Sequence, residues 1–191
     1  MDCEEYLACV LDYTIFKCDG ADYRPASASS YHRDAVLHAI ENACSPGDWA
    51  FNIDEAHAEE IDAEKFLSVP NEPWKYASED GEHFIDEVVG DKLQYWFAFL
   101  EPPLGDGPEL HNPIHGELVE QRLGVEDFHK VNAYLFPNGP GSLTVMEWST
   151  DWSEYFDDGR KGWGAACWSI YDHSLDRYVV IMVSIEKSPW S

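Results

Sequence analysis

Positive charge is scarce in this sequence. Its 191 residues include 12 lysines and arginines against 37 aspartates and glutamates, which gives a formal net charge of −25. Nucleic acids and anionic membranes bind positively charged protein surfaces, so we expect neither as a partner. A basic protein would be attracted and its encounter with this chain accelerated. The alternative is that the acidity serves only solubility.

Long hydrophobic runs and paired cysteines are also missing. No stretch of about 18 uncharged apolar residues occurs, and the chain opens on the acidic segment Met1–Glu5 instead of a basic and then apolar leader. The five cysteines are odd in number and include no CxxC pair. These features predict a cytoplasmic protein with reduced, mostly buried thiols and no zinc site.

Motifs that carry catalysis or hold cofactors are absent as well. Neither a glycine-rich phosphate loop nor a Gly-x-Ser-x-Gly elbow nor a calcium loop occurs. His111 and His115 have the i, i+4 spacing of a metal-binding pair, but Pro113 between them disfavours the helix that such a pair needs. Cys167 lies within a strand-like run, where packing is its expected role. No catalytic residue, metal or cofactor is therefore predicted.

Three runs of strand length dominate the C-terminal third. They are Leu143–Trp148, Trp163–Tyr171 and Tyr178–Ser184, all rich in β-branched and aromatic residues. The last run is apolar at both alternating sets of positions, which predicts a central strand covered on both faces. The connection Asp172–Arg177 is shorter than the roughly a dozen residues of a parallel crossover, so we expect antiparallel pairing.

The rest of the chain is mostly helical by spacing. Helices are predicted from Ser29 or Ser30 to about Cys44 and over Val125–Phe136, with a short helix at 79–91 and an exposed helical turn, then loop, at 54–64. Residues 4–16 fit a helix or a strand, and we favour a helix that Asp2 would cap. Leu93–Leu100 predicts a buried strand.

These elements together predict an α+β fold. We expect a single domain, 1–191, in which a helix-rich N-terminal half, 1–90, packs tightly on an α+β core, 91–191. That core is a mainly antiparallel sheet with a C-terminal strand meander.

The connection Asp151–Gly159 mixes carboxylates with aromatic rings. Rings supply rigid contact area and carboxylates supply charge recognition, so the mixture suits an interface with a Lys- or Arg-rich partner. Arg160 and Lys161 are expected to neutralise neighbouring acids. The alternative is a loop whose rings lie in the core while its acids stay in water. The predicted partner-binding residues are Asp151, Trp152, Glu154, Tyr155, Asp157 and Asp158.

Four stretches of the chain carry a resemblance, together with the strands Trp163–Tyr171 and Arg177–Ile181. The stretches are Tyr95–Pro103, Leu135–Gly139, Glu147–Trp152 and Tyr155–Gly159, which span roughly residues 93–185. They resemble a group of small, largely uncharacterised bacterial proteins, whose acidic single-domain character is similar to that of immunity proteins of bacterial toxin systems. Many immunity proteins neutralise basic nuclease toxins. The resemblance implies a non-enzymatic protein that covers a basic toxin, and it implies no catalytic residues.

Two other functions remain open. One is an enzyme of unknown type, which a deep pocket gathering Asp or Glu with a histidine such as His111 or His173 would favour. The other is a structural or regulatory module whose acidity only keeps it in solution.

Overall fold

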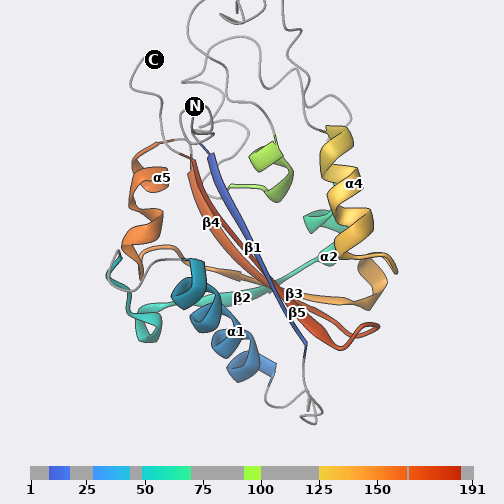
Figure 1. Ribbon diagram of the computed structural model, residues 1–191, viewed down its shortest axis with the longest axis horizontal. Helices are drawn as coiled ribbons and strands as arrows, with labels where there is room; N and C mark the ends of the chain where they lie inside the picture. Colours follow the sequence, from blue (N-terminus) through green and yellow to red (C-terminus); the bar gives the residue numbers. More distant parts are fainter. Residues whose placement is uncertain are drawn as a thin grey trace, which may run out of the picture.

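The computed structural model describes residues 9–17, 28–43, 49–69, 93–99, 125–162 and 164–185. In these residues the predicted α+β class is confirmed, because helices pack on a five-stranded sheet (Figure 1). The strands are β1 (Cys9–Lys17), β2 (Ala58–Ile61), β3 (Leu143–Trp148), β4 (Gly164–Asp172) and β5 (Arg177–Ile185). The α-helices are α1 (Ala28–Ala43), α2 (Ala63–Phe66), α4 (Val125–Leu135) and α5 (Asp157–Lys161). Short 3-10 helices are η3 (Ile53–Glu55), η6 (Tyr95–Phe99), η7 (Pro140–Ser142) and η8 (Glu154–Phe156).

The sheet has the order β1-β5-β4-β3-β2, and every neighbouring pair is antiparallel. This confirms the pairing predicted from the short connection between β4 and β5. Asp172, buried at the end of β4, organises that turn: its Oδ1 accepts the backbone N–H of Ser174 at 2.9 Å and of Leu175 at 3.3 Å. Asp176 takes a positive φ of 48°, which aspartate tolerates better than most residues.

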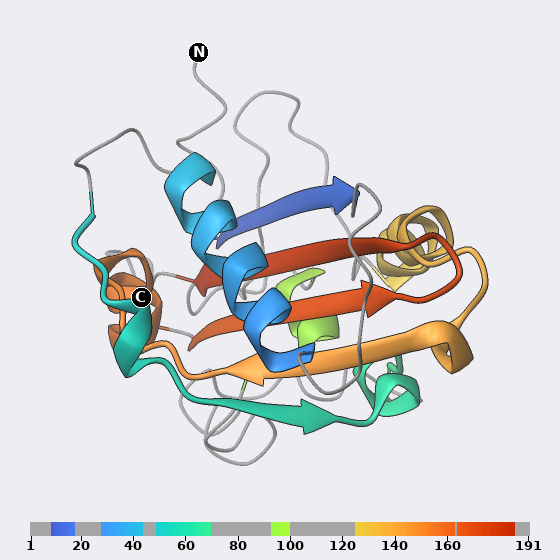
Figure 2. The same cartoon turned by 90° about the horizontal axis from the view of Figure 1, so that it is seen from below.

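Both faces of β5 are covered, as its two-sided apolar pattern predicts. Val180 and Met182 belong to one apolar cluster, which also contains Val36 of α1. Val179 and Ile181 belong to a second cluster, formed with residues of η6, α4 and α2. Figure 2 shows α1 crossing one face of the sheet, with η6 behind it. We call these two sides the α1 face and the η6 face.

Two helices predicted from spacing are confirmed. The helix expected from Ser29 or Ser30 to about Cys44 is α1, and the one expected over Val125–Phe136 is α4. The buried apolar residues of α4, Phe128 and Leu135, lie on the face that the spacing predicts. The helix predicted at 79–91 and the pair His111 and His115 lie outside the described residues.

The preference for a helix over residues 4–16 is wrong, because Cys9–Lys17 form the edge strand β1. β1 pairs with β5 along its whole length, from Cys9 opposite Ile185 to Lys17 opposite Arg177. Backbone pairing with a central strand outweighs the weak local helix signal. The first 90 residues therefore contribute β1 and β2 to the sheet in addition to α1.

Two further element types are also corrected. The segment predicted as a buried strand is the 3-10 helix η6, although its burial is as expected. Tyr95 of η6 stacks on Phe66, with ring centroids 4.8 Å apart, and meets Trp168 of β4 edge-on at 5.7 Å. The exposed helical turn predicted within 54–64 is present in part as η3, but the loop predicted after it contains the strand β2, whose Glu59 and Glu60 are exposed. Charged residues are common on edge strands, where they oppose association with other chains.

Candidate functional site

The aromatic side chains of the 151–158 connection lie in the core. Trp152 is 2% exposed, Tyr155 is 8% exposed, and Phe156 is fully buried beneath both rings. The Tyr155 hydroxyl donates to Asp12 Oδ2 of β1 at 2.8 Å, which ties the connection to the opposite edge of the sheet. The prediction that Trp152 and Tyr155 serve as exposed anchors is therefore wrong, because both rings fill the α1 face. A ring that is already buried stabilises the core and has little surface area left for contact with a partner.

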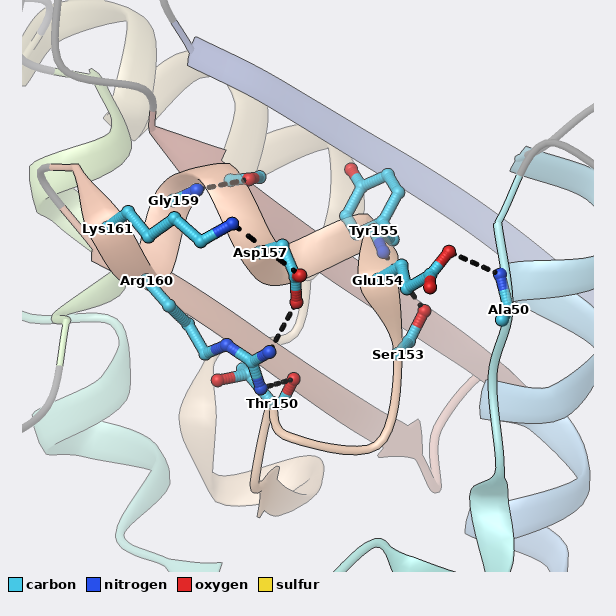
Figure 3. Close-up of polar contacts among 10 residues, drawn as sticks. Ala50, Thr150, Ser153, Glu154, Tyr155, Asp157, Gly159, Arg160 and Lys161 are labelled. Atoms are coloured by element: carbon cyan, nitrogen blue, oxygen red, sulfur yellow. Dashed lines mark hydrogen bonds and ion pairs between the residues drawn. The ribbon is translucent and has the colours of Figure 1, made fainter.

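The carboxylates of the connection stay outside, but several are engaged within the chain (Figure 3). Asp157 forms ion pairs with Arg160 and with Lys161, the latter at 3.7 Å, as expected for local neutralisation. The pKa of the exposed Asp151 is lowered from its usual value, mainly by a hydrogen bond from the side chain of Ser149.

Glu154 is also held by the chain. One of its carboxylate oxygens accepts the backbone N–H of Ala50 at 3.1 Å, as Figure 3 shows. Asp158 is exposed at the start of α5. The structure thus places the four predicted carboxylates at the surface around one connection, and it removes the two predicted rings from that surface.

Exposed rings next to these carboxylates come from a different segment, residues 49–52. Trp49 is 40% exposed and Phe51 is 39% exposed. The segment pairs antiparallel with 152–154, through a hydrogen bond from Asn52 N to Trp152 O of 2.7 Å. Sequence reasoning missed these two rings, although Trp-Ala-Phe-Asn alternates apolar and small or polar residues in the manner of an extended segment.

A hollow of about 420 Å³ opens beside β2 and β3. Its lining includes His57, Glu59, Glu147 and Asp151, with Leu93 as an apolar wall. Glu59 lies directly opposite Glu147 in the β2–β3 ladder, so both carboxylates occupy the η6 face. His173, which sequence reasoning proposed for such a pocket, instead bonds Thr144 Oγ1 at 2.9 Å in the β4–β5 turn region. We call this feature the β2–β3 hollow.

A buried histidine of α1, His32, joins this helix to β4. His32 Nδ1 is 2.8 Å from Ser169 Oγ, which also accepts the indole N–H of Trp148 at 2.8 Å. Because Ser169 Oγ already accepts from Trp148, its hydroxyl is free to donate to His32 Nδ1. Burial lowers the pKa of His32 to about 4, and a contribution from the backbone of Ser169 opposes this shift. Both His32 and Ser169 are fully buried, so this serine–histidine pair supports the core and cannot meet a substrate.

The described part of the chain contains no cluster that could hold a metal ion, and its buried thiol Cys167 is inaccessible. No group of three or more His, Cys, Asp or Glu side chains is placed there to hold a metal ion. Cys167 is fully buried, as predicted, and that burial raises its pKa. A thiol kept protonated and out of contact with solvent is unreactive, so its role is packing.

Comparison with known proteins finds no matching family model, no similar curated protein and no similar solved structure. None of the helices in the described ranges is both long enough and apolar enough to cross a membrane.

Proposed function

We propose that this chain is a non-enzymatic acidic protein that binds a basic protein partner. The observation that carries the proposal is the net charge of −25, combined with a surface on which Asp151, Glu154 and Asp158 stay exposed around one rigid connection. A field of this sign and size draws a basic protein toward the chain before contact. The carboxylates then meet lysine or arginine of the partner at short range.

The resemblance to immunity proteins makes a toxin the partner class that we propose. A basic nuclease toxin has a positively charged surface because it must bind nucleic acid. An acidic protein that covers this surface blocks access of the substrate without any chemistry of its own. This role places the protein in the cytoplasm, where an internally produced toxin would act.

The test is the salt dependence of association with the native partner. The partner is captured with the tagged chain at low salt, identified by mass spectrometry and purified, with the product of an adjacent toxin-like reading frame as the first candidate. We expect the association rate constant, measured by stopped flow, to fall about 10-fold or more between about 20 mM and about 150 mM salt. A rate constant unchanged across this range would contradict charge-steered binding.

The β2–β3 hollow favours a second candidate function, an enzyme of the acid–base type. The hollow brings His57 together with Glu59 and Glu147, the combination that sequence reasoning required for this alternative. Its volume lies within the range of small-molecule sites, about 300–1,000 Å³. Carboxylates and imidazole are the side chains that most often transfer protons in catalysis.

This candidate predicts hydrolysis of one or more chromogenic esters, phosphate esters or glycosides by the purified protein. Glu147→Gln should lower that activity about 100-fold or more, because it removes the ionisable group but keeps the side-chain shape. Glu126→Gln, an exposed change on α4, is the matched control and should leave the activity unchanged. An activity that survives Glu147→Gln, or no activity in any assay of the set, would exclude the candidate.

A further inference from the structure

Trp49 and Phe51 are two large rings fixed at the surface by main-chain pairing. The backbone N–H of Glu154 donates to Ala50 O at 2.9 Å, and that of Asn52 donates to Trp152 O at 2.7 Å. Phe51 stands opposite Ser153 in the resulting antiparallel bridge. The segment is therefore held against the buried part of the 151–158 connection, and its rings keep a defined position.

Trp49 and Phe51 are neighbouring exposed rings, unlike an isolated surface aromatic. Trp49 and Phe51 flank Ala50 and lie beside the same segment, 153–155, because Trp49 contacts the ring of Tyr155 and Phe51 stands opposite Ser153. The ring of Tyr155 lies edge-on to the indole of Trp49, with ring centroids 6.5 Å apart. Tyr134 of α4 is more exposed, at 79%, but among the described residues of that helix no other large apolar side chain is exposed. Neighbouring aromatic rings on a hydrogen-bonded main chain, with apolar area open to water, are typical of the centre of a protein interface.

Acidic groups border the two rings. The Glu154 carboxylate is held beside the segment by the N–H of Ala50, in the arrangement of Figure 3. Asp54 and Glu55 are exposed in the helical turn that follows Phe51. Asp54 forms an ion pair with Arg33, and Glu55 accepts from Asn52 Nδ2 at 2.7 Å, so their positions are defined as well. A cation that approaches the rings therefore has the Glu154 carboxylate and the Glu55 carboxylate nearby, while the charge of Asp54 is compensated by Arg33.

We propose that the strip formed by Trp49, Ala50 and Phe51, with the Glu154 carboxylate beside it, docks an arginine-bearing segment of a basic protein. This inference rests on the proposed function and specifies its contact surface. Arginine fits better than lysine because its planar guanidinium can stack on the indole while its N–H groups bond a carboxylate. We call this surface the Trp49 strip. It replaces the contact surface predicted at Trp152 and Tyr155.

The experiment uses hexa-arginine as the probe, with hexa-lysine as the comparison. Binding to the full chain is measured by isothermal titration calorimetry at about 20 mM salt, where surface electrostatics are strong. We expect the double variant Trp49→Ser/Phe51→Ser to bind hexa-arginine about 10-fold more weakly than the unaltered chain. Neither substitution changes the net charge. Tyr134→Ser, which removes an exposed ring from α4, is the matched control and should bind hexa-arginine as the unaltered chain does.

A second measurement separates local docking from any change in folding. In a ¹⁵N-labelled unaltered chain, the indole signal of Trp49, assigned by its loss in Trp49→Phe, should shift on addition of hexa-arginine. The indole signals of the buried Trp152 and Trp168 should stay in place. If the double substitution weakens the binding of hexa-lysine less than that of hexa-arginine, stacking of arginine on the strip is supported.

The possible failures are distinguishable. Equal binding of hexa-arginine to the unaltered chain and the double variant, or an unshifted Trp49 indole signal, would contradict docking at the Trp49 strip. The proposed attraction of a basic partner would not be affected by either result. If neither peptide binds at low salt, the charge attraction on which the proposed function rests is itself contradicted.

Discussion

Replacement of Gly159 by alanine is expected to lower the free energy of unfolding by about 3 kcal/mol, a large effect for one methyl group. A Cβ at this position would lie 2.5 Å from Gly164 O and 2.7 Å from Ser184 Oγ. The nearest of these atoms is backbone of β4, so it cannot move without disturbing the strand. The backbone N–H of Gly159 also donates to Ser184 Oγ at 3.0 Å, and a shift of α5 would break this bond.

Gly141→Ala is the matched control for that substitution. A Cβ at Gly141 meets no atom within 4 Å, and the residue has no positive φ. The free energy of unfolding of Gly141→Ala should therefore stay within about 0.5 kcal/mol of that of the unaltered chain. Thermal unfolding followed by circular dichroism would measure both variants, with a fall in midpoint of about 10 °C expected for Gly159→Ala. Equal midpoints for the two variants would show that α5 does not pack against β4 and β5 as described.

The C-terminal meander was predictable because its signals are local and agree with one another. The run Tyr178–Ser184 is apolar at every position except its last, and the turn before it contains Asp172 and Asp176, which favour a tight connection. The helix α4 was equally clear, since Phe128 and Leu135 recur at helical spacing between an acidic first turn and Pro137. In these elements the local pattern and the tertiary environment favour the same structure.

β1 and η6 could not be predicted because their structure is decided by distant partners. Residues 9–17 become a strand where β5 offers a free edge, about 170 residues further along the chain. Four consecutive residues of η6, Tyr95 to Ala98, are buried, and such uniform burial removes the periodicity that separates a strand from a helix. Tyr13 of β1 and Tyr95 of η6 meet through their hydroxyls, 2.8 Å apart, so the two unpredicted elements pack on each other.

Within 151–158 the exposure of the carboxylates agrees with the prediction, whereas the burial of the rings does not. Composition alone cannot tell which aromatic of an acidic loop points inward. A signal was present, because Trp152, Tyr155 and Phe156 have the i, i+3, i+4 spacing of a buried helical face. Trp49 and Phe51 carry the opposite signal, alternation on an extended segment, but their position next to 151–158 depends on a chain pairing that no local pattern specifies.

His32 predicts a pH dependence of stability. Its pKa in the folded protein is about 4, below the ordinary 6.5, because burial under α1 disfavours the charged ring. The unfolded chain therefore binds a proton at this residue between about pH 6.5 and about pH 4, where the folded chain does not. The stability that depends on neutral His32 is fully present above pH 6.5. It is lost as the pH falls through this window, by about 3 kcal/mol in total.

The variant His32→Asn isolates this contribution. Asparagine does not titrate, and its side-chain oxygen can accept the hydroxyl of Ser169 in place of His32 Nδ1, which preserves the bond to Trp148. The smaller side chain lowers stability at every pH. The difference in free energy of unfolding between the two proteins should therefore shrink by about 3 kcal/mol from pH 7 to pH 4 in urea titrations.

The same titrations contain the control, because Tyr134 is exposed on α4, away from the α1 face. Tyr134→Ser leaves the α1 face unchanged, and the difference in free energy of unfolding between this variant and the unaltered chain should be the same at each pH. The contributions of titrating groups that all three proteins share cancel in the differences. Two parallel curves for His32→Asn and the unaltered chain would mean that His32 is protonated as easily in the folded protein as in the unfolded chain. The buried contact between α1 and Ser169 would then be wrong, and with it the packing of α1 on the sheet.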